Sequence, residues 1–144
     1  MRIVDANVLL YAVNTDARHH EASRRWLDAA LSGEDTVGFT WVAMLAFLRL
    51  STKVGLFPHP LPVADATTQL EEWTAAAGAV VAHPGPGHAE RLGRLLADVG
   101  SGGNLVNDAH LAAVALEHRA EVVSYDQDFA LFTDLRWRRP DDLL

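Results

Sequence analysis

Cysteine is absent from this sequence of 144 residues. Without cysteine the chain forms no disulfide, builds no thiolate zinc site and has no cysteine nucleophile. Lysine is nearly absent too, because 11 of the 12 basic residues are arginine and Lys53 is the only exception. Oxygen ligands from carboxylates are therefore the main remaining route to a protein-bound metal.

Long apolar runs are also missing. No run approaches the roughly 18 residues that a membrane-spanning helix requires, and no secretory-type segment opens the chain. Low-complexity tracts and internal repeats are not evident. The hydrophobic fraction of 49% and charged fraction of 22% are typical of a globular protein. We expect a single domain over residues 1–144 and a cytoplasmic location.

The formal net charge is -7, which argues against a basic surface of the kind that binds duplex DNA. Nucleic acid is not excluded, since a site built from carboxylates is negative until its cations bind. Arg136, Arg138 and Arg139 cluster near the end of the sequence. Their planar side chains suit phosphate contacts, although a solvated charged edge is the alternative interpretation.

Apolar periodicity predicts strands that alternate with helices. Strands are expected at 2–4, 36–39, 79–82, 122–125 and 135–137, and helices at 20–31, 41–53, 63–77, 88–99 and 105–118. An apolar turn is expected at 8–11 and a helical turn at 129–132, and Asn104 is placed to cap the helix that follows it. This alternation predicts an α/β fold with a mostly parallel central sheet and helices on both faces.

Three aspartates stand at positions where such a fold brings them together. Asp5 follows the first strand, Asp126 lies at or just past the end of the strand at 122–125, and Asp108 falls in the first turn of a helix. Ligands of parallel sheets bind outside the carboxyl ends of the strands. Converging carboxylates repel one another, and Mg²⁺ or Mn²⁺ relieves that repulsion through oxygen ligands. Metal-assisted phosphodiester hydrolysis is the chemistry that this arrangement favours.

Other interpretations of the same residues remain open. Asp5 and Asn7 could cap the following helical turn, Asp108 could only compensate a helix dipole, and Asp126 and Asp128 could start a turn. Asp5 could also be the nucleophile of a phosphoryl-transfer enzyme, although such enzymes often carry a second aspartate at the position that Asn7 occupies. The seven histidines have no recognised metal-ligand spacing.

Four segments of the sequence resemble the PIN-domain family, and in particular the VapC toxins of bacterial toxin–antitoxin pairs. They occur in the expected order and spacing and span nearly the whole chain. The segments are Ile3-Val4-Asp5-Ala6-Asn7-Val8-Leu9-Leu10-Tyr11, Phe47-Leu48-Arg49, Asn104 to Ala113, and Val123-Ser124-Tyr125-Asp126-Gln127-Asp128-Phe129.

The resemblance implies a three-layer PIN-like sandwich and an endoribonuclease that depends on Mg²⁺ or Mn²⁺. It implies a structured transfer or ribosomal RNA as substrate, a homodimer, and a VapB-type antitoxin as partner. On the same basis the metal-binding and catalytic acids are Asp5, Asp108 and Asp126. Asn7, Thr40 and Asp128 are the residues expected to support them.

One position departs from the family pattern. The family usually places a glutamate just before the segment Phe47-Leu48-Arg49, and here that position is Ala46. No acid lies anywhere between Trp41 and Lys53. We expect Asp128 or water to fill the vacant coordination position, with a weaker or single principal cation. The alternative is a non-catalytic domain that binds RNA or protein and lost its activity through Ala46.

Overall fold

A parallel sheet of five short strands forms the centre of the protein. The computed structural model describes residues 1–144. The strands are β1 (Arg2–Val4), β2 (Val37–Phe39), β3 (Ala79–Val81), β4 (Glu121–Val123) and β5 (Trp137–Arg138). They lie in the order β3-β2-β1-β4-β5, and every neighbouring pair is parallel. The predicted mostly parallel sheet is confirmed.

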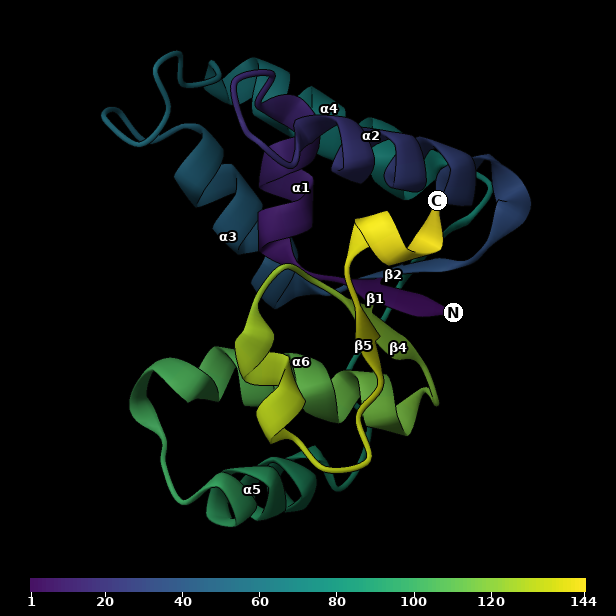
Figure 1. The fold of residues 1–144 in the computed structure, drawn as a ribbon, viewed down its shortest axis with the longest axis vertical. Coiled ribbons are helices and arrows are strands. Elements are labelled where there is room, and N and C mark those ends of the chain that lie inside the picture. Colours follow the sequence, from purple (N-terminus) through teal and green to yellow (C-terminus); the bar gives the residue numbers. More distant parts are fainter.

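Helices cover both faces of this sheet, as predicted (Figure 1). One face carries α1 (Ala6–Val13), α2 (His20–Ala29), α3 (Trp41–Ser51) and α4 (Val63–Ala75), and the other carries α5 (His88–Val99) and α6 (Val106–Glu117). Short helical turns follow at Ala30–Glu34, Gly103–Leu105, Gln127–Leu131 and Pro140–Leu143. No helix has both the length and the apolar character needed to cross a membrane.

The strand sequences explain why the sheet is buried between two layers. Ile3 belongs to the apolar cluster on the α5–α6 side, and its neighbour Val4 belongs to the cluster on the α1–α4 side. Val122 and Val123 divide in the same way, and all four side chains are fully buried. Successive side chains of a strand point to opposite faces, so an unbroken apolar run suits a sheet that is covered twice.

Two local predictions are wrong. The apolar turn expected at 8–11 is part of the longer helix α1, because Asp5 caps its first turn and Val8 and Leu9 bury its inner face. Asn104 does not cap α6, because the chain first makes a tight turn over Gly103–Leu105. Leu105 then occupies the cap position without a side-chain hydrogen bond.

The arrangement of strands fixes where a site can form. β1 and β4 are neighbours, and the Asp5 amide continues their pairing by donating to the carbonyl oxygen of Val123 at 3.0 Å. The residues that follow each strand therefore emerge side by side at the carboxyl edge of the sheet. This edge brings the beginning of the chain next to residues 124–128.

Candidate metal centre

Asp5 is the most firmly held acid at this edge. Its Oδ1 accepts from the Ala6 amide at 2.8 Å, and its Oδ2 accepts from Asn7 Nδ2 at 2.9 Å and from Ser124 Oγ at 2.6 Å. Burial raises the pKa of the Asp5 carboxyl above its ordinary value, the bonds from Ser124 and Ala6 oppose that rise, and the charge of Asp126 adds to it. The hydrogen bonds fix the orientation of this carboxylate.

Ser124 links the two strand ends and was not foreseen from the sequence. Its fully buried hydroxyl donates to Asp5 and accepts from Asn7 Nδ2 at 3.0 Å and from the Asp126 amide at 2.9 Å. One donor and two acceptor sites are all that a hydroxyl offers, so the group is fully used. A serine after a strand has no distinctive sequence signal. The only indication in the sequence is that Ser124 stands between the strand residue Val123 and the predicted ligand Asp126.

Asn7 lies where the resemblance placed a supporting residue. Besides its two donated bonds, its Oδ1 accepts from the Tyr125 amide at 3.2 Å. A single side chain therefore connects the start of α1 to the segment after β4. Asn7 holds Asp5 and the Asp126 turn in one framework, and its contribution to activity remains a prediction.

Three other carboxylates form a cluster beside this framework. Asp108, Asp126 and Asp128 each offer an oxygen, and these oxygens all lie within 4.8 Å of one another. Asp108 comes from the first turn of α6, and Asp126 caps the helical turn Gln127–Leu131 by accepting from the Asp128 amide at 2.9 Å. Asp128, expected only as support, is therefore a full member of the cluster by position.

Asp108 lies in a setting that disfavours its charge. Burial, and then the neighbouring charges of Asp126, Asp5 and Asp128, together raise the pKa of Asp108 to about 7. Asp108 has three acidic neighbours and no cationic side chain as a partner, so a bound cation would offset the repulsion among these carboxylates. The donor set consists of carboxylate oxygens, which hard divalent cations such as Mg²⁺ and Mn²⁺ prefer.

Ala46 faces the same site. A small cleft of about 70 Å³ is lined by Asp5 and Asp108 together with Ala46 and Val42 of α3. The position at which the family pattern expects a glutamate therefore opens onto both acids. The alanine itself adds no oxygen ligand to this cleft.

Thr40 has a local structural function. Its buried hydroxyl accepts from the Ala43 amide at 3.4 Å and caps the first turn of α3. This cap sets where α3 begins, and α3 in turn carries Ala46 to the cleft. No hydrogen bond joins Thr40 to the acids. Its observed contact with the site is indirect, through the start of α3, and its predicted support of the acids stays a prediction.

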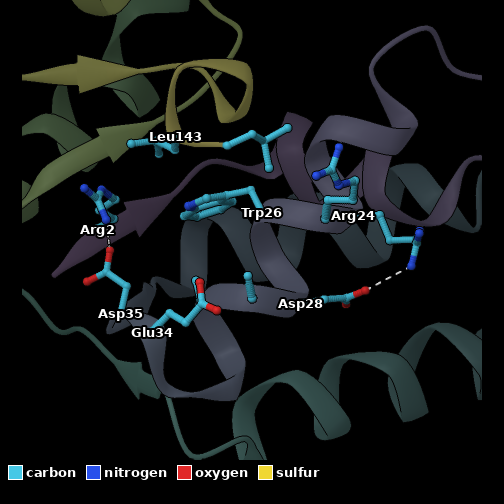
Figure 2. Close-up of a pocket in the computed structure, with 11 residues that line it drawn as sticks. Arg2, Arg24, Trp26, Asp28, Glu34, Asp35 and Leu143 are labelled. Carbon is cyan, nitrogen blue, oxygen red and sulfur yellow. Dashed lines mark hydrogen bonds and ion pairs between the residues drawn. The ribbon is translucent and has the colours of Figure 1, made fainter.

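A separate hollow of about 460 Å³ lies at the opposite, amino end of β1, between α2 and the last residues of the chain (Figure 2). Trp26 and Leu143 form its apolar wall. Its charged groups are largely paired, Arg2 with Asp35 and Arg24 with Asp28. None of the predicted site residues lines it, so the hollow is distinct from the acidic site.

The sequence matches the model of the PIN domain over residues 2–135. The match covers both strand ends, the start of α6 and the cleft between them. The chain belongs to the PIN-domain family. All four segments that suggested the resemblance lie inside the matched region.

Individual relatives narrow the class within the PIN-domain family. The chain is 62% identical over 144 residues to Ribonuclease VapC37 of Mycobacterium tuberculosis, with both chains fully covered. Among solved structures, the chain resembles the VapC20 toxin of the same organism, which is described as cleaving the sarcin–ricin loop. The two structures superpose with a TM-score of 0.68 at 16% sequence identity, and the match covers 94% of this chain and 99% of the VapC20 chain. VapBC-1 of nontypeable Haemophilus influenzae gives the same TM-score and identity over 97% and 98%.

These similarities confirm the PIN-like fold and the predicted class of enzyme, a ribonuclease of the VapC toxin type. They do not favour the phosphoryl-transfer or non-catalytic alternatives. PIN-domain nucleases depend on divalent metals, and the acidic cluster is consistent with that requirement.

Proposed function

We propose that this PIN-domain protein is an endoribonuclease toxin that uses Mg²⁺ or Mn²⁺, bound by Asp5, Asp108 and Asp126, to hydrolyse RNA phosphodiester bonds. The supporting observation is the convergence of carboxylates from three distant segments, with Asp108, Asp126 and Asp128 within 4.8 Å of one another beside the fixed Asp5. We assign all 144 residues to one PIN domain, and we place its action on structured transfer or ribosomal RNA in the cytoplasm.

A divalent cation held by Asp5, Asp108 and Asp126 would supply Lewis-acid stabilisation of the charged phosphate and would lower the pKa of a water bound to it. The side chains do the positioning. Asp5 is held by three donors, so its carboxylate presents a fixed face to the cleft. Because the pKa of Asp108 is raised to about 7, binding of a cation by this carboxylate would be coupled to the loss of its proton. Asp128 is exposed and lies within the acidic cluster, so we propose that it or a water supplies the ligand missing at Ala46.

The proposed partner is a small VapB-type antitoxin. Among the structural neighbours are VapBC assemblies from Rickettsia felis and Haemophilus influenzae. A guanidinium from such a partner would replace the cation among the unpaired carboxylates, since an arginine forms charge-assisted bonds with them. We also propose a homodimer for the toxin. Expression of the protein without the partner should stop growth. Normal growth of cells that contain abundant protein with unchanged acidic residues would contradict the toxin assignment.

Cleavage of total cellular RNA tests the enzymatic part directly. The wild type, Asp108→Asn and Asp5→Asn are compared with Mg²⁺, with Mn²⁺ and with EDTA, and new 5′ ends are mapped by sequencing. Cleavage at discrete positions is expected only for the wild type with metal, with a loss of about 100-fold or more in either variant. Asp65→Asn, an exposed acid on α4, is the matched control and should cleave normally. Equal cleavage by Asp108→Asn would refute the assignment.

A further inference from the structure

Three arginines lie on or beside the edge strand β5. Arg136, Arg138 and Arg139 are exposed, with 73% and 51% of the first two side chains open to solvent. β5 pairs only with β4, so its outer edge has no neighbouring strand. In a chain with 12 basic residues and a net charge of -7, this is a local concentration of positive charge.

The surrounding acids only partly neutralise these arginines. Glu121 lies 3.4 Å from Arg138 and 3.9 Å from Arg136, but the same carboxylate also pairs with Arg2 at 3.1 Å. Arg139 makes no ion pair within 4.0 Å, although Asp141 is close enough to feel its charge and Asp142 accepts from its backbone amide. Glu121 therefore contacts three guanidinium groups, of which that of Arg2 also pairs with Asp35.

Two of the three arginines, Arg138 and Arg139, line a hollow beside β5. This hollow, of about 410 Å³, is lined by Gln127, Ala130, Trp137, Arg138, Arg139 and Asp142. Gln127 stands between Asp126 and Asp128 in the chain, so the hollow reaches the turn that carries these two acids. Arg138 pairs with Val123, at the end of β4 from which the Asp126 turn departs. The hollow therefore extends from β5 to the turn that carries Asp126 and Asp128, whereas the ion pairs of Arg136 and Arg138 lie at Glu121, the first residue of β4.

We infer that this strip of arginines along β5 binds the single-stranded RNA that flanks the cleaved phosphodiester. This inference rests on the proposed function and names a binding surface for its substrate. The guanidinium groups contact backbone phosphates bidentately, Gln127 offers hydrogen bonds to a base or ribose, and the partly exposed Trp137 offers an aromatic surface for stacking. An acidic segment of a partner protein would suit the charge but would make no use of the hollow's approach to the turn that carries Asp126 and Asp128.

The strip is tested by replacing the three arginines with glutamine, as R136Q/R138Q/R139Q, and by Arg139→Gln alone. The single variant removes the unpaired, exposed guanidinium and leaves the ion pairs of Glu121 intact. Steady-state cleavage of an RNA mapped from the cellular assay is expected to show KM raised by about tenfold or more in the triple variant, with kcat within about twofold. Arg94→Gln, an exposed arginine on α5 with an ion pair to Glu90, is the control and should match the wild type.

The salt dependence of binding separates phosphate recognition from structural damage. Binding of a fluorescein-labelled single-stranded RNA is followed by anisotropy in EDTA over a series of KCl concentrations. The slope of log K against log salt should become shallower by about 0.7 for each phosphate that the variant no longer neutralises. An unchanged KM and slope in the triple variant would overturn the inference. Loss of antitoxin binding with unchanged RNA binding would also overturn it. If the wild type binds RNA but never cleaves it, the proposed function is wrong. The salt dependence of binding would still show whether the three arginines contact RNA phosphates.

Discussion

At the scale of single residues, Ser124 has the most connections in the site. Its hydroxyl bonds to Asp5, Asn7 and the Asp126 amide. We expect Ser124→Ala to lower the free energy of unfolding by about 1–3 kcal/mol, because buried partners lose their bonds. Metal-dependent cleavage should fall as well. Ser51→Ala, a fully buried serine whose hydroxyl has no partner, is the matched control in urea denaturation and should be nearly neutral. Equal losses in the two variants would contradict this role.

The raised pKa of Asp108 predicts how the stability of the metal-free protein depends on pH. Its pKa is raised by burial, then by Asp126, Asp5 and Asp128, to about 7, so the folded protein holds this proton more tightly than the unfolded chain. Without metal, stability should therefore fall as pH rises from about 4 to about 7 and then level off. Asp108→Asn removes this loss and should stabilise the metal-free protein at pH 8 by about 1–2 kcal/mol, allowing for solvent screening of a half-buried group.

Thermal denaturation in EDTA at pH 4 and pH 8 measures this difference. The gain of the Asp108→Asn variant over the wild type should be small at pH 4 and full at pH 8. Asp128→Asn, an exposed member of the same cluster, provides a comparison with a smaller expected gain. A gain that is independent of pH would show that the effect does not come from the titration of Asp108.

Ala46 is the residue at which this chain departs from its family. Because Ala46 lines the cleft with Asp5 and Asp108, Ala46→Glu adds a carboxylate at the metal site. Cleavage should be unchanged or raised, and the Mg²⁺ concentration at half-maximal activity should fall by about tenfold, since each added ligand strengthens binding. Ala46→Gln adds the same bulk without the charge and should not lower that concentration. Complete loss of cleavage in Ala46→Glu alone would contradict the prediction.

At the scale of elements, α3 is the helix that sets one wall of the cleft. Thr40 caps it from the end of β2. Thr40→Ala should cost about 1 kcal/mol of unfolding free energy by chemical denaturation, and Thr40→Ser should recover most of it, because serine caps as well as threonine. If Thr40 instead acts directly on the metal, Thr40→Ala would reduce cleavage without a change in stability.

Sequence patterns predicted some elements better than others. α5 was expected over its full observed range, because amphipathic spacing and flanking glycines mark both ends. α1 was underestimated, since eight residues with few polar positions give little helical periodicity. The Asn104 cap failed because the preceding glycines allowed an extra turn, and Gly103 adopts φ 58°. Such choices depend on tertiary packing that a local pattern does not record.

At the scale of the whole molecule, metal binding should stabilise the folded chain. A cation that binds only the native state adds about 2.7 kcal/mol at a concentration about 100 times its Kd. Adding Mg²⁺ or Mn²⁺ to the EDTA-treated protein should therefore raise Tm by several degrees, measured by differential scanning calorimetry. The double variant Asp108→Asn with Asp126→Asn should show almost no shift. An equal shift in that variant would locate the cation elsewhere.

The position of the acids was predictable from the overall topology, while their detailed roles were not. Strand ends of a parallel sheet share one edge, so the meeting of Asp5 with Asp126 followed from the element order. The sequence did not reveal that Ser124 and Asn7 fix Asp5 through hydrogen bonds. It also did not reveal that Asp128 has an oxygen within 4.8 Å of oxygens of both Asp108 and Asp126. Those features depend on side-chain directions at two loop positions.

The pairing of β1 with β4 also has a consequence for biosynthesis. Arg2 and Glu121 are 119 positions apart and lie side by side in the sheet. A ribosome makes β1 long before β4, and Ser124, Asp126 and Asp128 come directly after β4 in the chain. An unfinished chain lacks these residues and has no assembled acidic cluster. We therefore expect the growing polypeptide to be inactive toward RNA until residues 121–128 have emerged and β4 has paired with β1.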